Sequence, residues 1–148
     1  MDIAHVVQSS VAPVFLLTGV AATLGVLTNR LARVVDRARV LEERLEKEPA
    51  RRGALLVDLR ALARRARYIN AAISMCAVAA LLVALVVVSL FADAFVGLEL
   101  AKAIALLFVA AMLSLAVAYI LFFVEVRIAI VALRIGLPRE LDKVSKIK

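Results

Sequence analysis

The sequence has little of what most enzyme active sites require. It contains one histidine, His5, one cysteine, Cys76, and no tryptophan. A single histidine excludes metal sites built on paired histidines, and a single cysteine excludes a disulfide within the chain. We find no glycine-rich phosphate-binding loop and expect no Ser-His-Asp or Cys-His triad. The sequence therefore predicts a protein that is not an enzyme and that uses no metal and no cofactor.

Charged residues are scarce along most of the chain and concentrated in two segments. The 148 residues are 65% hydrophobic, with a mean hydropathy of +1.01, which is far too apolar for a soluble domain. Of the 19 Lys and Arg residues, 12 lie in residues 29–68 and 6 in residues 125–148. Because charges are costly at bilayer depth, they collect outside the membrane. The composition predicts an all-α integral membrane protein.

Three stretches are apolar enough to cross a bilayer, at about residues 11–28, 69–92 and 100–124. The first, with 18 residues, spans about 27 Å as a helix, close to the thickness of the hydrocarbon core. We expect a single membrane domain over residues 1–148. Because Met1–His5 lacks a positively charged region, we expect the first span to remain as an anchor and not to be cleaved.

The charged segment at about residues 29–68 follows the first span with no helix-breaking residue between them. Apolar residues recur through it at alternating spacings of three and four, as in helices that pack along one another. Pro49 and Gly53 bracket a connection of the length that makes consecutive helices antiparallel neighbours. We therefore expect the first two membrane helices to extend into a cytoplasmic antiparallel helical hairpin. Its two apolar seams are Leu24, Leu27, Leu31, Val34, Ala38, Leu41 and Leu45, and Leu55, Leu59, Leu62, Ala66, Ile69, Ile73 and Cys76.

The distribution of Lys and Arg predicts the orientation. Residues 29–68 and the C-terminal end, residues 125–148, are rich in them, whereas the N-terminus and the short loop of residues 93–99 have none. By the positive-inside rule, the N-terminus lies outside, and the hairpin and the C-terminus lie in the cytoplasm. Gly136 and Pro138 predict that the third helix ends there. The residues before them are apolar enough to pack against the hairpin.

Five arginines near the predicted membrane boundary are the candidate residues for binding anions or anionic lipid. Arginines three or four residues apart on a helix repel one another, so an anion has to neutralise them. Anionic headgroups are the simplest source, and each juxtamembrane Lys or Arg gains about 1 kcal/mol from them. Internal acids are a second source: we expect Asp36 and Glu125 to form structural ion pairs, Glu125 with Arg30 or Arg67. The five arginines are Arg30, Arg33, Arg37, Arg64 and Arg67.

Two groups of small residues predict close helix packing, within one chain or between copies. Small side chains let helix backbones approach each other in a membrane, and we expect the protein to be a homo-oligomer. A stripe of small residues that lines a pore is the alternative interpretation. The two groups are Gly19, Ala22 and Thr23 in the first span, and Ala111, Ser114 and Ala118 in the third.

Three stretches resemble those of a known family. They are Ala12–Leu17 in the first span, Arg30–Leu41 beyond it, and Arg65–Ile73 at the start of the second span. Over most of its length the chain resembles the small bacterial membrane proteins grouped as domain of unknown function 2721. The resemblance implies a multi-pass protein of the bacterial inner membrane, and it supplies no catalytic residues.

Two functions are consistent with these features. The first is a non-enzymatic, self-associating inner-membrane protein whose basic hairpin binds anionic lipid or a partner. The alternative is a homo-oligomeric ion channel whose arginines line a cytoplasmic vestibule and attract an inorganic ion. Nucleic acid is not an expected partner, because the hairpin mixes both charges and lacks interleaved aromatic residues.

Overall fold

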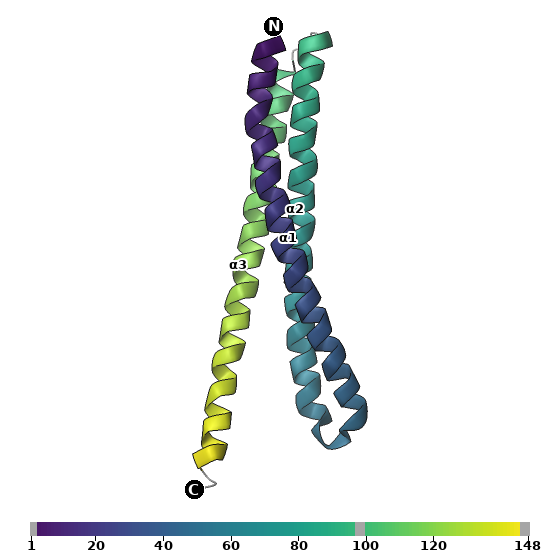
Figure 1. Ribbon diagram of the computed structural model, residues 1–148, viewed down its shortest axis with the longest axis vertical. Coiled ribbons are helices and arrows are strands. Elements are labelled where there is room, and N and C mark those ends of the chain that lie inside the picture. Colours follow the sequence, from purple (N-terminus) through teal and green to yellow (C-terminus); the bar gives the residue numbers. More distant parts are fainter. Residues whose placement is uncertain (1–2, 97–99, 146–148) are drawn as a thin grey trace.

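The protein is built from three long helices and one short helical turn. A computed structural model describes residues 3–96 and 100–145, with side chains for residue 4, residues 7–95 and residues 100–130. Every element within these residues is helical. The elements, shown in Figure 1, are α1 (Ile3–Lys47), the 3-10 turn η1 (Pro49–Arg51), α2 (Arg52–Val96) and α3 (Ala101–Ser145).

The helices α1, α2 and α3 are each long and apolar enough to cross a membrane. Each has 45 residues, which at 1.5 Å per residue gives a length of about 67 Å. The hydrocarbon core of a bilayer is only about 30 Å thick, so each helix extends well beyond the part that could lie in lipid. The prediction of an all-helical chain with three long apolar helices is confirmed.

The central helix of the bundle is α2. It packs against both α1 and α3, and successive long helices run in opposite directions. The η1 turn reverses the chain so that the charged ends of α1 and α2 lie side by side, whereas α3 diverges from them toward its C-terminus (Figure 1). The side chains after Ile130 lie outside the described residues, and so does the predicted packing of that end against the α1–α2 pair.

The core is formed by residues that repeat every seven positions, as in coiled-coil packing. The outer helices α1 and α3 each bury one such row, and α2, which lies between them, buries two. Most of the predicted seam residues, such as Leu31 and Ile73, pack in the same cluster. The rows are Val20, Leu27 and Val34 on α1; Leu62, Ile69, Cys76 and Val83, and Ala72, Ala79 and Val86, on α2; and Ala111, Ala118 and Glu125 on α3.

The third helix is longer than predicted. It continues through Gly136 and Pro138 to Ser145, so the prediction that it ends there is wrong. A proline removes one backbone hydrogen bond and bends a helix without having to end it. The residues after Pro138 include several good helix formers, which favour continuation. The first helix likewise contains a proline, Pro13, well inside its start at Ile3.

The turn between α2 and α3 is short because α2 continues into the predicted loop. Since α2 ends at Val96, the first part of the loop predicted at residues 93–99 is helical. The carboxylate of Asp93, in the last turn of α2, accepts a hydrogen bond of 2.8 Å from the backbone N–H of Leu100. This bond satisfies one of the N–H groups that the start of a helix leaves without a partner within the helix.

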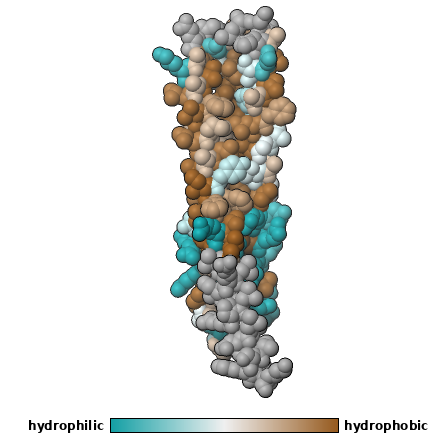
Figure 2. Space-filling model, turned by 90° about the vertical axis from the view of Figure 1, so that its left-hand side faces the viewer, coloured by the Kyte–Doolittle hydropathy of each residue, from teal (hydrophilic) through white to brown (hydrophobic). Residues whose placement is uncertain are grey.

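A broad apolar surface covers the part of the bundle away from η1. Figure 2 shows it on the α3 side as a brown surface, bounded below by teal hydrophilic side chains. On α3, Leu106, Leu113 and Ile120 recur every seven residues and are all exposed. A continuous apolar surface of this size is unfavourable in water and fits the interior of a bilayer.

Candidate functional site

Glu125 of α3 is a fully buried carboxylate at the end of the apolar core, with an exposed fraction of 0%. It follows Ala111 and Ala118 at intervals of seven residues, so the buried row of α3 ends in a charge. A buried carboxylate is costly unless cations and hydrogen bonds compensate for its lost hydration. The two neighbouring helices supply the cations.

Arg65 of α2 is the principal partner of Glu125. Its Nε and Nη2 atoms donate hydrogen bonds to Oε1 of Glu125 at 3.1 and 2.9 Å. Arg65 stands seven residues before Ala72, so it extends a buried row of α2, as Glu125 extends that of α3. Because α2 and α3 are antiparallel, the charged ends of the two rows meet. Such charge-assisted hydrogen bonds are roughly twice as strong as neutral ones.

Arg30 of α1 is the second cation at Glu125. Its Nη2 atom lies 3.0 Å from Oε2 of Glu125, an ion-pair distance, but this oxygen accepts no well-aligned hydrogen bond from the described residues. The Arg30 guanidinium carbon also lies 5.2 Å from the centroid of the Phe122 ring, which is close enough for a cation–π interaction. Charge and the aromatic ring therefore hold Arg30 more than directed hydrogen bonds do. We name Arg30, Arg65 and Glu125 the Glu125 cluster.

Four arginines from α1 and α2 line one groove at the Glu125 cluster. The groove has a volume of about 350 Å³, and Val34 and Leu62 provide its apolar lining. Guanidinium groups donate paired hydrogen bonds in a geometry that matches carboxylate and phosphate oxygens. The groove is therefore suited to an anion. We name it the arginine groove; its arginines are Arg30, Arg33, Arg37 and Arg65.

Arg64 and Arg67 lie on a different surface. Together with Arg60 they line a groove of about 480 Å³ whose lining residues all belong to α2, and which we name the α2 groove. Within the described part of the chain, none of these three arginines forms an ion pair. The five candidate arginines therefore divide between two surfaces and do not form one site.

Comparison with known families identifies the family of this chain. A model of the family described as "Protein of unknown function (DUF2721)" matches residues 10–135. The chain belongs to the DUF2721 family. The match includes Arg30, Arg65 and Glu125, so the whole Glu125 cluster lies in the part that the family shares, and the resemblance found in the sequence is confirmed. Neither the curated proteins nor the solved structures contain a match.

In this DUF2721 protein, the structure selects between the two partners that the sequence offered for Glu125. Arg30 lies beside Glu125, whereas Arg67 lies in the α2 groove. Arg65, the residue with the most direct contact, was not among the partners predicted for Glu125 or the candidate anion-binding arginines. Its seven-residue spacing from Ala72, which is buried, is the signal that could have identified it, because both then lie on one face of a helix.

Asp36 does not take part in the site. Its side chain is exposed, and it forms no ion pair with any described residue. The structural ion pair predicted for Asp36 is therefore not found in the part of the chain that is described. In the same part, no three His, Cys, Asp or Glu side chains are grouped so that they could hold a metal ion.

The two groups of small residues have different surroundings. Ala111 and Ala118 are buried in the bundle, and the hydroxyl of Ser114 donates a hydrogen bond of 2.9 Å to the backbone carbonyl of Met75 on α2. On α1, the hydroxyl of Thr23 lies 3.0 Å from that of Tyr119 on α3. The remaining two small residues of α1, Gly19 and Ala22, are exposed.

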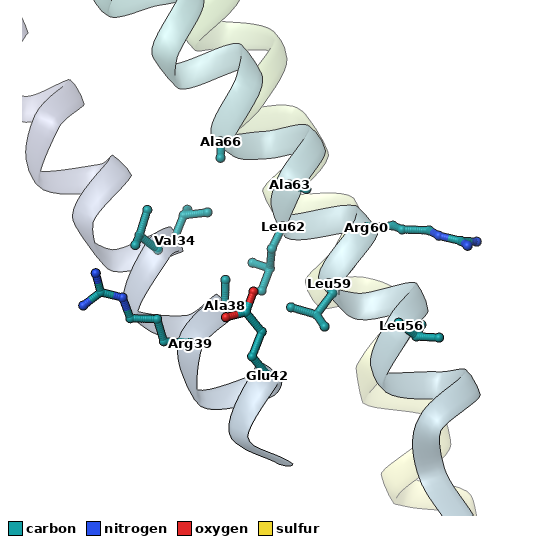
Figure 3. A pocket seen from close by; sticks show the side chains of 11 residues that line it. Val34, Ala38, Arg39, Glu42, Leu56, Leu59, Arg60, Leu62, Ala63 and Ala66 are labelled. Carbon is teal, nitrogen blue, oxygen red and sulfur yellow. The ribbon is translucent and has the colours of Figure 1, made fainter. Parts of the chain in front are cut away.

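An apolar groove of about 450 Å³ lies between the charged ends of α1 and α2 (Figure 3). Val34 and Leu62 line both this groove and the arginine groove, so their side chains lie between the two. In Figure 3, Ala38 and Leu59 lie between the helices while Arg60 points away from them. The lining of this groove is mostly apolar, and its charged residues, Arg39, Glu42 and Arg60, are of both signs, in contrast with the arginine groove.

Proposed function

We propose that the protein is a non-enzymatic, multi-pass protein of the bacterial inner membrane whose basic hairpin binds anionic lipid headgroups. In this proposal the charged ends of α1 and α2, at about residues 29–68, form a cytoplasmic antiparallel hairpin, and the N-terminus lies outside. Support comes from the 12 Lys and Arg residues of this segment, which the positive-inside rule assigns to the cytoplasm. The apolar length of the three helices supports the placement in a membrane.

The arginine groove is the observation that carries this proposal. It gathers positive charges from two helices directly after the apolar stretch of α1, at the level where headgroups would lie. Glu125 is the one acid in ion-pair contact with these arginines among the described residues. Most of the charge of the groove is therefore left without an ion pair among the described residues, and basic pockets at the cytoplasmic side of membrane helices bind lipid headgroups.

We also propose that the protein associates with copies of itself through α1. Gly19 and Gly25 are exposed, and a Cβ atom added at either position would have no heavy atom within 4 Å beyond its chain neighbours and the adjacent backbone of its own helix. Together with the exposed Ala22, they leave a surface on which a second helix could approach the backbone closely. Packing within the chain does not account for these residues, whereas it does account for Ala111 and Ala118.

The ion-channel alternative has less support. Thr18, Thr28 and Ser74, polar residues near or within the apolar stretches, donate hydrogen bonds to carbonyls of their own helices. Such bonds leave these hydroxyls directed at the backbone and not toward a water path. No row of polar side chains crosses the apolar part of the bundle among the described residues.

Lipid retention tests the proposed function. The protein is reconstituted with equal amounts of phosphatidylcholine and phosphatidylglycerol, extracted in mild detergent, and its bound lipids are quantified by mass spectrometry. We expect enrichment of phosphatidylglycerol, and a loss of that enrichment in Arg33→Glu and Arg37→Glu. Arg44→Glu is the matched control, because Arg44 is exposed on the same helix near η1. Equal retention of the two lipids by the unmodified protein would refute the proposal.

A further inference from the structure

The charge balance of the arginine groove is unusual for so small a space. Four guanidinium groups line about 350 Å³, and among the side chains that the structure describes, Glu125 is the one carboxylate in ion-pair contact with any of them. Arg33 and Arg37 have no ion pair with a described residue. Like charges three and four residues apart on a helix repel each other, so the groove gains most from an anion that several arginines share.

Phosphate has the chemistry that the groove requires. Its oxygens accept bidentate hydrogen bonds from guanidinium groups, and arginine is the preferred residue for this recognition. A volume of about 350 Å³ lies within the range of sites that hold small ligands or headgroups. The lining combines four basic side chains with the apolar Val34 and Leu62, which suits a phosphate that carries an organic substituent.

We propose that the arginine groove is a specific site for one phosphate-bearing anion, and that Glu125 is the internal counter-ion with which this anion competes. The proposal deepens the proposed function, and it rests on that function in so far as the phosphate belongs to a lipid headgroup. A free phosphate has the same chemistry and could occupy the same site. General attraction of the hairpin to a charged membrane, in contrast, requires no particular groove.

The geometry of Glu125 supports the competition. Its Oε1 atom accepts two hydrogen bonds from Arg65, whereas its Oε2 atom is close to Arg30 without a well-aligned hydrogen bond. The N–H groups of Arg30 could therefore donate hydrogen bonds to a phosphate oxygen while the bonds between Arg65 and Glu125 stay intact. Removing the negative charge of Glu125 should release both arginines for the anion and strengthen its binding.

Matched pairs of neutral variants separate the specific site from general attraction. Arg33→Gln with Arg37→Gln removes two charges from the arginine groove, and Arg64→Gln with Arg67→Gln removes two charges from the α2 groove. Each protein is studied in phosphatidylcholine nanodiscs titrated with inorganic phosphate by calorimetry. A second series contains added phosphatidylglycerol, and the bound lipids are counted by native mass spectrometry.

The proposal predicts a loss of affinity of about tenfold or more for the arginine-groove pair, since each charged hydrogen bond lost costs roughly that factor. The α2-groove pair should change affinity less than about twofold, because surface charges contribute little. Glu125→Gln should bind more tightly than the unmodified protein. If the arginine-groove pair weakens the binding of inorganic phosphate, the ligand is a free anion. If it weakens only the binding of phosphatidylglycerol, the ligand is a lipid headgroup.

Equal losses of affinity in the two variant pairs would overturn the proposal of a specific site, while leaving the proposed attraction to anionic lipid intact. Absence of phosphatidylglycerol enrichment in the unmodified protein would instead refute the proposed function itself. An affinity that is unchanged or lower in folded Glu125→Gln would overturn the competition. Circular dichroism verifies that each variant is folded, and if Glu125→Gln does not fold, the comparison of the two arginine pairs decides the existence of the site.

Discussion

The two arginine-lined grooves differ in what lies beside them. The arginine groove draws its charges from α1 and α2 and borders the buried carboxylate of Glu125, whereas the α2 groove lies on one helix and its arginines form no ion pair with any residue that the structure describes. Arg64 and Arg65 are adjacent in sequence and yet belong to different grooves. Successive residues point in directions about 100° apart around a helix. The position of an arginine relative to the buried rows, and not the local number of charges, therefore determines which site it joins.

The two grooves should also differ in how much their arginines contribute to the stability of the protein. Glu125 is fully buried, and the side chain of Arg65 is only 22% exposed. Removing one member of a buried ion pair leaves a charge without compensation and costs about 3–5 kcal/mol. An exposed ion pair contributes only roughly 0–1 kcal/mol to the free energy of unfolding, and an exposed arginine without a partner contributes no more than that. Loss of Arg65 should therefore reduce the stability more than loss of an exposed arginine.

Arg65→Gln should destabilise the protein by about 3–5 kcal/mol, because the buried Glu125 would lose its two hydrogen bonds to Arg65 and keep only the ion pair with Arg30. Arg64→Gln should change the stability by less than about 1 kcal/mol. Unfolding in a series of sodium dodecyl sulfate concentrations, followed by circular dichroism, measures both. The two variants make the same change of charge at adjacent positions, so equal effects would contradict the distinction between the two grooves.

A second prediction compares two alanines in the apolar part of the bundle, one buried and one exposed. Ala118 is buried with an exposed fraction of 1%, and Ala22 is exposed. Ala118→Leu should destabilise the bundle by about 1–3 kcal/mol, since inserting a larger side chain into a packed core forces neighbouring groups apart. Ala22→Leu should leave the stability of one chain unchanged and lower the fraction of oligomers in nanodiscs, measured by mass. A stable Ala118→Leu protein would show that α3 is less closely packed than the structure indicates.

Much of the fold could be predicted because helix length and apolar periodicity are local properties. The spacing of residues such as Leu27, Val34 and Ile69 was sufficient to identify the seam between α1 and α2. The ends of the helices were less predictable. Pro138 lies inside α3, because one proline lowers helix stability without always ending a helix.

The Glu125 cluster could be predicted only in part. The sequence placed Glu125 and Arg30 near the same boundary, but the choice among Arg64, Arg65 and Arg67 depends on which face of α2 meets α3. That face follows from the second buried row of α2, which includes Ala72 and has no large apolar residue before Val86. Small residues in a row are a weak signal in a sequence where alanine is common, so the row was not recognised.

A third prediction compares the two arginines at Glu125. Double-mutant cycles that combine Glu125→Gln with Arg65→Gln or Arg30→Gln isolate each pairwise coupling. The coupling to Arg65 should exceed that to Arg30 by about 1 kcal/mol, since only Arg65 makes well-aligned hydrogen bonds. Detergent unfolding of the unmodified protein, the two single variants and the double variant supplies the four free energies for each cycle. A stronger coupling to Arg30 would contradict the interpretation that Arg30 is available to an anion.

The smallest effect should come from the contact between Thr23 on α1 and Tyr119 on α3. The hydroxyls of Thr23 and Tyr119 are 3.0 Å apart, and both residues lie partly or fully at the surface of the bundle. Tyr119→Phe should cost only about 0.5–1 kcal/mol, the usual net value of a neutral hydrogen bond. Thr23→Val is the matched control: its effect should be similar, and the double variant should cost little more than either single one. A loss near that of Arg65→Gln would mean that this hydrogen bond, and not the Glu125 cluster, is the main link between the outer helices.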